Sequence, residues 1–231
     1  MTRMAGQAPI VRDARGDANL VRPWTLAFVV GELAGFIPPA VAGVTLGMLA
    51  APDFAFVIFL TLAGVAEGAV LGAAQAWVLR RYAPGIDSRQ WITATAAAAG
   101  FAWFIGMGTS VIGGSSTAPA WVMIVLLSPL WVMALVGMGF AQWTVLRQTV
   151  PRSARWIWVT AAAWLAGVTI PIVALSAVPD GWPIWTHGVV GLAAAVAMGL
   201  TVGALTGRTL TNLLLTQRIH SGIAGTRSGR P

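Results

Sequence analysis

Two similar stretches, "GAAQAWVLRR" at residues 72–81 and "GFAQWTVLRQ" at 139–148, decide how this chain folds. Gly, Ala, Gln, Val, Leu and Arg return in the same order 67 positions later. The rest of the chain is strongly apolar: 57% of its 231 residues are hydrophobic, 9% are charged, and the mean hydropathy is +0.78. Soluble domains carry roughly 25% charged residues. The composition therefore predicts an integral membrane protein. The two similar stretches indicate that this protein contains a repeated segment.

Six apolar segments are long enough to cross a bilayer, which takes about 20 helical residues. They cover about 24–50, 54–79, 91–113, 120–146, 156–177 and 183–207. Short polar or turn-forming separators join them, so we expect an all-α integral membrane protein with six transmembrane helices. We also expect a disordered cytoplasmic N-terminal tail at 1–22, a transmembrane domain at 23–210 and a cytoplasmic C-terminal tail at 211–231.

All 14 basic residues are arginine, and they lie on one side of the expected bundle. They occur in the N-terminal tail, in the loops at 80–90 and 147–155, and from Arg208 onward, whereas the opposite loops contain none. The positive-inside rule therefore predicts that both termini and both arginine-bearing loops are cytoplasmic. This topology accounts for the net charge of +7 better than nucleic-acid binding does. The expected location is a bacterial inner membrane.

The similarity extends beyond the two opening stretches. Residues 68–106 align with 135–173 without a gap, and this alignment pairs Trp91 with Trp158. Chance matches of Ala and Val are common in such a chain, but Gln, Pro, Trp and Arg also match in register. A weaker copy lies at 203–210. We therefore expect pseudo-repeated helical hairpins in parallel orientation, at about 23–81, 90–147 and 156–210.

The repeated pattern is G-x-x-Q-x-x-V-L-R, followed by an arginine-bearing loop and W-x-T-A. It resembles repeats in uncharacterised bacterial multi-span membrane proteins. The resemblance covers 68–106 and 135–173, with a degraded copy at 203–210. It implies a bundle of hairpins and no known activity, so it assigns no functional residue.

Gln75, Gln142 and Thr206 are the candidates for polar contacts between helices. Gln75 and Gln142 lie five residues before Arg80 and Arg147, which places their amides ~7.5 Å inside the cytoplasmic boundary. At this depth an amide bonds to a neighbouring helix, because its alternative is contact with lipid. We therefore interpret the repeated unit as a packing and anchoring module. The alternative is that the glutamines line a polar path.

Glu32 and Glu67 lie inside the hydrocarbon zone, at expected depths of ~13 and ~20 Å from the cytoplasmic face. An intramembrane acid indicates a functional site by default. Both residues flank glycine pairs, which favour a helix interface over lipid. Two such carboxyls without an intramembrane arginine are not both expected to ionise. They are candidates for binding a proton or cation, and the alternative is a structural brace within the first hairpin.

His187, near the outer end of the sixth span, is a candidate proton site or pigment ligand, although a lone interfacial histidine more often only forms hydrogen bonds. The chain has no cysteine and two histidines, which excludes thiolate sites and argues against a metal site built by the protein. The glycine pairs lack the Lys and Ser/Thr of a phosphate loop. No nucleophile–base constellation appears either, so we expect no metal, no cofactor and no enzymatic activity.

These features favour a non-enzymatic membrane protein that acts as an accessory or scaffold subunit of a larger membrane complex. The loops are too short for a catalytic domain, and few polar groups line any path. The alternative is a small transporter or channel that uses Glu32 and Glu67 to bind a proton or cation. The expected partners are the lipid bilayer and membrane-protein subunits, with no nucleic acid.

Overall fold

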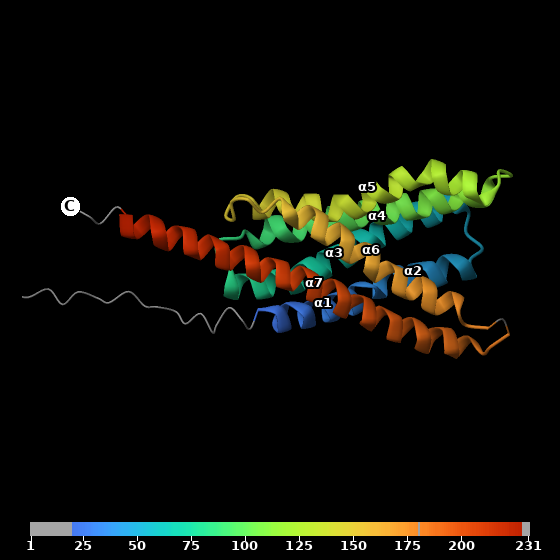
Figure 1. Cartoon of the computed structure of the whole chain (residues 1–231). Coiled ribbons are helices and arrows are strands. Elements are labelled where there is room, and N and C mark those ends of the chain that lie inside the picture. The colour runs from blue at the N-terminus through green and yellow to red at the C-terminus, as the bar shows by residue number, and fades with distance from the viewer. Residues whose placement is uncertain (1–19, 180, 228–231) are drawn as a thin grey trace, which may run out of the picture.

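The computed structural model describes residues 20–179 and 181–227, which form an all-helical bundle (Figure 1). Its helices are α1 (Val21–Gly35), α2 (Ile37–Met48), α3 (Asp53–Tyr82), α4 (Ser88–Ser115), α5 (Ala120–Leu146), α6 (Arg155–Ser176) and α7 (Ile184–Arg227). With α1 and α2 taken together, six helical segments are long and apolar enough to cross a membrane. The prediction of an all-α protein with six membrane-spanning segments is confirmed.

The first span breaks at Phe36, although the sequence predicted one continuous segment over 24–50. Pro38 and Pro39 lie in the first turn of α2, and proline has no N–H group to continue the hydrogen bonds of α1. The Gly35 carbonyl therefore has no donor three or four residues further on. Beyond the break, α2 packs mainly on α3.

The last helix is longer than the sequence predicted: α7 ends at Arg227, whereas the predicted end was near residue 210. Leu213 and Leu214 are buried against the bundle, so the apolar face of the helix persists past that point. The predicted C-terminal tail at 211–231 therefore begins inside a helix. The predicted N-terminal tail at 1–22 lies almost wholly outside the described residues.

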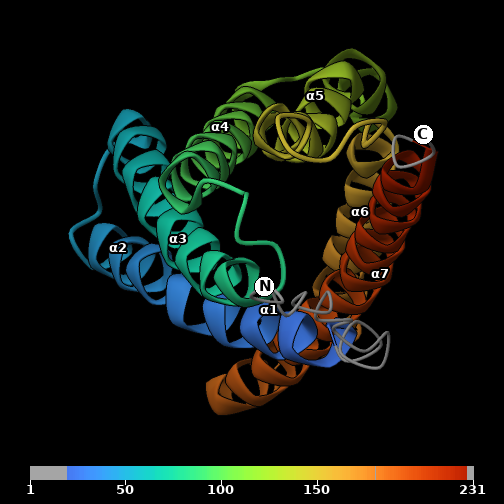
Figure 2. The same cartoon turned by 90° about the vertical axis from the view of Figure 1, so that its left-hand side faces the viewer.

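The spans stand side by side in a closed ring when the bundle is seen from one end (Figure 2). Neighbouring contacts follow the order α1, α3, α4, α5, α6 and α7, and α7 completes the ring by packing on α1. Each of these helices thus has two neighbours in the ring, and α3 also contacts α2 outside this order. The remaining surface of each helix faces either the surroundings of the bundle or the inside of the ring.

Glycines make the closest helix approaches. At Gly68 of α3, an added Cβ would lie 2.5 Å from the Ala99 Cβ and 2.7 Å from the Thr95 carbonyl oxygen, both in α4. At Gly139 of α5, it would lie 2.5 Å from the carbonyl oxygen of Ile157 in α6. Small residues allow backbones to approach in this way inside membranes, where packing is a main source of helix association.

We predict that Gly68→Ala destabilises the bundle by about 1–3 kcal/mol, because the extra methyl group cannot fit without moving α4 away from α3. Gly108 of α4 is the matched control, since a Cβ there would meet no atom within 4 Å. Gly108→Ala should leave stability unchanged or raise it slightly. Unfolding of both variants by SDS titration in mixed micelles measures the difference, and equal losses would contradict this packing role.

Candidate functional site

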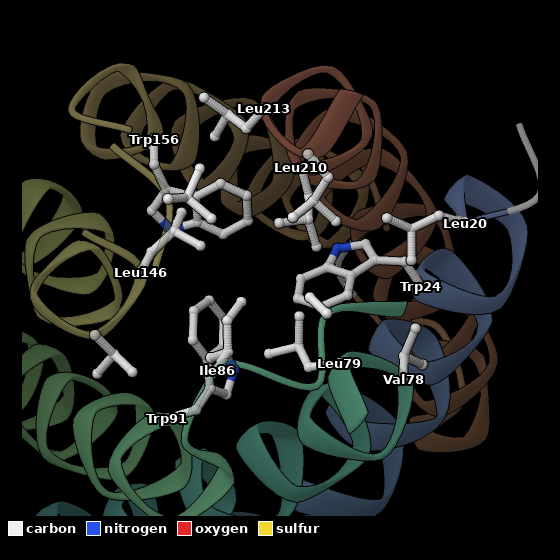
Figure 3. Packing of buried hydrophobic residues seen from close by; sticks show 14 of the residues in the cluster. Leu20, Trp24, Val78, Leu79, Ile86, Trp91, Leu146, Trp156, Leu210 and Leu213 are labelled. Atoms are coloured by element: carbon white, nitrogen blue, oxygen red, sulfur yellow. The ribbon is translucent and has the colours of Figure 1, made fainter. Parts of the chain in front are cut away.

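Three tryptophans meet inside the ring, close to the end that carries the arginine-bearing loops (Figure 3). Trp24 of α1, Trp91 of α4 and Trp156 of α6 are 0%, 0% and 1% exposed. Their ring centroids are 6.2, 6.2 and 6.0 Å apart, with interplanar angles of 73°, 79° and 63°. Edge-to-face contact of this kind is a geometry that the aromatic quadrupole favours. We call these three residues the tryptophan cluster.

Each indole of the cluster donates a hydrogen bond from its Nε1 to a side chain on a neighbouring helix of the ring. The bonds run from Trp24 to Thr206 Oγ1 at 3.0 Å, from Trp91 to Gln75 Oε1 at 2.9 Å, and from Trp156 to Gln142 Oε1 at 3.2 Å. They join α1 to α7, α4 to α3 and α6 to α5. The three residues that the sequence singled out for interhelical contacts are thus the acceptors of the cluster.

Gln142 links two of these bonds into one network. Its Nε2 donates to Thr95 Oγ1 at 3.2 Å and to Gln75 Oε1 at 3.3 Å, while its own carbonyl accepts from Trp156. The Thr95 hydroxyl donates in turn to the backbone carbonyl of Trp91 at 2.9 Å. All of these side chains are buried, so losing one member leaves its partners unsatisfied at a cost.

A glycine lies three residues before each acceptor and packs on the residue that follows a tryptophan of the cluster. A Cβ added to Gly72 would lie 3.0 Å from the Cα of Ile92. A Cβ added to Gly139 would lie 2.9 Å from the Cα of Ile157, and one added to Gly203 would lie 2.9 Å from the Cα of Thr25. The close backbone approach brings each acceptor within reach of its indole.

Apolar side chains fill the ring on the loop side of the cluster. The residues four positions after the acceptors, Leu79, Leu146 and Leu210, are each 0% exposed. Those four positions further on are also buried: Ala83, Val150 and Leu214. We call these six residues the apolar layer, and together with the three indoles they form the main part of the largest hydrophobic cluster of the described chain.

The α6 tryptophan that bonds to Gln142, as Trp91 bonds to Gln75, is Trp156 and not Trp158, which the ungapped alignment pairs with Trp91. Trp158 is 68% exposed on the outside of the ring. The acceptor precedes its tryptophan by 16 residues for Trp91 and by 14 residues for Trp156. The separation between acceptor and tryptophan is therefore two residues shorter for Trp156, so an ungapped alignment misses this donor by two positions. A tryptophan early in a helix, soon after the arginine-bearing loop, is the sequence signal that marks both donors.

The start of α4 is fixed just before Trp91. Asp87 caps the helix by accepting hydrogen bonds from the backbone N–H groups of Gln90 at 3.1 Å and Arg89 at 2.8 Å. These bonds, with that of Gln90 foremost, hold the pKa of the exposed Asp87 carboxyl below its usual range. Because Trp91 follows in the first turn, the cap helps to set where its indole enters the cluster.

Glu32 of α1 and Glu67 of α3 lie together at the interface of these helices, 3% and 8% exposed. We call them the acid pair. Their carboxyls are neighbours, and two adjacent buried carboxylates repel each other, which favours a proton on one of them. Trp103 Nε1 of α4 donates to Glu67 Oε2 at 2.6 Å. Glu32 Oε2 is buried and accepts no hydrogen bond from any N–H or hydroxyl group of the described residues.

Two glycines make room for the acid pair and its donor. At Gly35, the last residue of α1, an added Cβ would lie 2.9 Å from the carbonyl oxygen and 3.2 Å from the Cγ of Glu67. At Gly64 the space that a side chain would need is filled by the Trp103 indole. That indole also contacts Phe36 at the break between α1 and α2, with 6.3 Å between ring centroids. The acid pair therefore lies beside the broken helix.

His187 belongs to neither group. It lies near the start of α7, is partly exposed, and its buried Nδ1 has no hydrogen-bond partner within the described chain. In the ranges 20–179 and 181–227 no group of three or more His, Asp or Glu residues could hold a metal ion. The structure thus brings Gln75, Gln142 and Thr206 to one cluster and Glu32 to Glu67, and leaves His187 apart.

Comparisons with protein-family models, with curated proteins and with solved structures find no match to this chain.

We predict that Gln142→Leu destabilises the protein by about 1–2 kcal/mol and Thr206→Val by about 0.6 kcal/mol, in line with other intramembrane hydrogen bonds. The order follows from the contacts, because Gln142 bonds to three residues and Thr206 accepts from one indole. Gln148→Leu is the control: this exposed glutamine, two residues beyond α5, donates to Gln90 and to the Thr144 carbonyl, and its loss should cost less than about 0.5 kcal/mol. A loss at Gln148 as large as that at Gln142, in SDS unfolding titrations, would contradict the network.

Proposed function

We propose that this protein is a non-enzymatic scaffold or accessory subunit of a membrane complex in a bacterial inner membrane. The observation that carries the proposal is the tryptophan cluster. Three indoles, their acceptors and the apolar layer fill one end of the ring. Such packing holds six spans in a fixed arrangement, which a scaffold needs in order to present constant surfaces to partner subunits and lipid.

The proposal includes three pseudo-repeated hairpins, formed by α1 to α3, by α4 with α5, and by α6 with α7. The first helix of each hairpin contributes one tryptophan to the cluster, and the last helix contributes one acceptor. Each tryptophan bonds to the acceptor of the hairpin before it in the ring. The glycine that precedes every acceptor by three residues gives further support for a pseudo-threefold arrangement.

Both termini and both arginine-bearing loops are cytoplasmic in this proposal. The distribution of arginine supports it, since the loops at the opposite end contain none. The loop between α3 and α4 and the loop between α5 and α6 lie at the same end of the bundle as the start of α1 and the C-terminal part of α7 (Figure 1). The tryptophan cluster would then close the cytoplasmic side.

A small transporter or channel that uses Glu32 and Glu67 is the second candidate. The observation that favours it is the buried acid pair with its unsatisfied Glu32 oxygen. It is the weaker candidate because the tryptophan cluster lies between the acid pair and the arginine-bearing end. An ion that crossed the bundle through the inside of the ring would require the three indoles to separate and their hydrogen bonds to break.

The proposed topology predicts opposite labelling at the two ends of α4. The chain has no cysteine, so single cysteines introduced at Ser88 and Ser116 report their own accessibility. An impermeant thiol reagent should label Ser88→Cys only from the cytoplasmic side and Ser116→Cys only from the outside, because α4 crosses the bilayer between them. Labelling of both positions from one side would contradict the topology.

The scaffold proposal predicts a stoichiometric membrane-protein partner after tagged purification from the native host in mild detergent. The purified chain alone, reconstituted in liposomes, should carry no proton or sodium flux, because the cluster closes the ring. Proton or sodium flux that Glu67→Gln abolishes would establish the transporter instead. Asp53→Asn is the control for that comparison, since this exposed acid lies at the start of the same helix.

A further inference from the structure

We propose that Glu32 and Glu67 form a binding site for one monovalent metal cation, in competition with a proton, where α1, α3 and α4 meet. The site depends on the geometry of the acid pair and does not depend on the scaffold role. Its ligands come from two carboxyls and one backbone carbonyl, next to the break in the first span.

Hydrogen bonding at the acid pair assigns the charges of its members. An indole N–H can only donate, so Glu67 Oε2 is an acceptor for Trp103, and this bond stabilises Glu67 as the carboxylate. Glu32 receives no such donor at Oε2. Glu32 is therefore the member that holds a proton and shares it with Glu67. A pair that shares one proton keeps one negative charge inside the membrane.

That negative charge lies far along the helices from the basic side chains of α1, α3 and α4. Arg22 of α1 is ten residues before Glu32, or ~15 Å along the helix, and Arg80 of α3 is thirteen residues after Glu67, or ~20 Å. On α4, Arg89 precedes Trp103 by fourteen residues, ~21 Å. An uncompensated charge at membrane depth is costly. A bound cation or a second proton removes that cost.

The break between α1 and α2 supplies a further oxygen ligand. Pro38 and Pro39 remove the N–H groups that would otherwise bond to the Gly35 carbonyl, and Gly35 packs directly on Glu67. Carboxylate and carbonyl oxygens are the ligands that hard cations prefer. Carbonyls at broken membrane helices coordinate cations in other membrane proteins. Gly35, whose carbonyl has no intrahelical donor, thus packs against Glu67 of the acid pair.

A monovalent cation fits this site better than a divalent one. A single positive charge balances a pair that shares one proton. A divalent cation would require both carboxyls to ionise, and Ca²⁺ takes about six to eight oxygen ligands. Within the described residues no third acidic or histidine side chain joins the pair. Because a second proton restores neutrality equally well, protons and the cation compete for the site.

Thermal unfolding of the purified protein tests the proposal. N-methylglucamine chloride is replaced by lithium, sodium or potassium chloride at constant ionic strength, between about pH 6 and pH 9. One of these cations should raise Tm by at least about 2 °C in a saturable manner, since a ligand of the folded state stabilises it. The rise should be larger at the higher pH. Glu32→Gln and Glu67→Gln should abolish it, and Asp53→Asn should retain it.

Labelling by dicyclohexylcarbodiimide gives a second readout that needs no variant. This apolar reagent reacts with protonated carboxyls inside membranes, so mass spectrometry should locate the adduct on Glu32 or Glu67. The cation that raises Tm should slow labelling by at least about threefold. The proposal would be overturned if none of the three cations changed Tm or the labelling rate. It would also be overturned if the cation effect persisted in the Glu67→Gln variant. Neither result would bear on partner retention, which tests the scaffold role.

Discussion

The hydrogen bond from a buried indole to a side chain on the adjacent helix is the interaction on which the rest of the ring depends. It occurs for Trp24, Trp91 and Trp156, and each bond links two hairpins of the proposed arrangement. The membrane interior offers no water to replace a lost partner, so each bond holds its two helices at a fixed separation. Edge-to-face contacts then couple the three bonds, and the position of one hairpin constrains the other two.

An indole bonded to an acceptor occurs in all three hairpins of the proposed arrangement, whereas the buried acid pair lies in the first alone. Glu32 lies eight residues after its tryptophan and Glu67 eight residues before its acceptor. The corresponding positions in the other hairpins hold Ala99, Trp164, Ala134 and Met198. The only break in a described span also occurs in the first hairpin, beside the acid pair. The two features together distinguish the interface of α1 and α3 from the corresponding interfaces of the proposed arrangement.

The spans were predictable from the sequence because long apolar segments separated by short polar loops have few other solutions. Gln75 and Gln142 stood out because polar residues that repeat in register are rare in such a chain. The three tryptophan donors could not be singled out in the same way, since the chain contains 12 tryptophans and most of them fit a belt at the membrane interface. The bond from Trp103 to Glu67 was beyond prediction, because it depends on a close approach at Gly64 between two helices.

Exchange of the indole N–H protons with D₂O, followed by NMR on protein labelled with ¹⁵N-tryptophan in micelles, reports directly on the three indole hydrogen bonds. Trp24, Trp91 and Trp156 should exchange only when the protein unfolds, far more slowly than Trp182, which is 54% exposed. Gln75→Leu should accelerate exchange at Trp91 more than at Trp24. Rapid exchange at Trp91 in the folded wild-type protein would show that its indole is not held in a buried hydrogen bond.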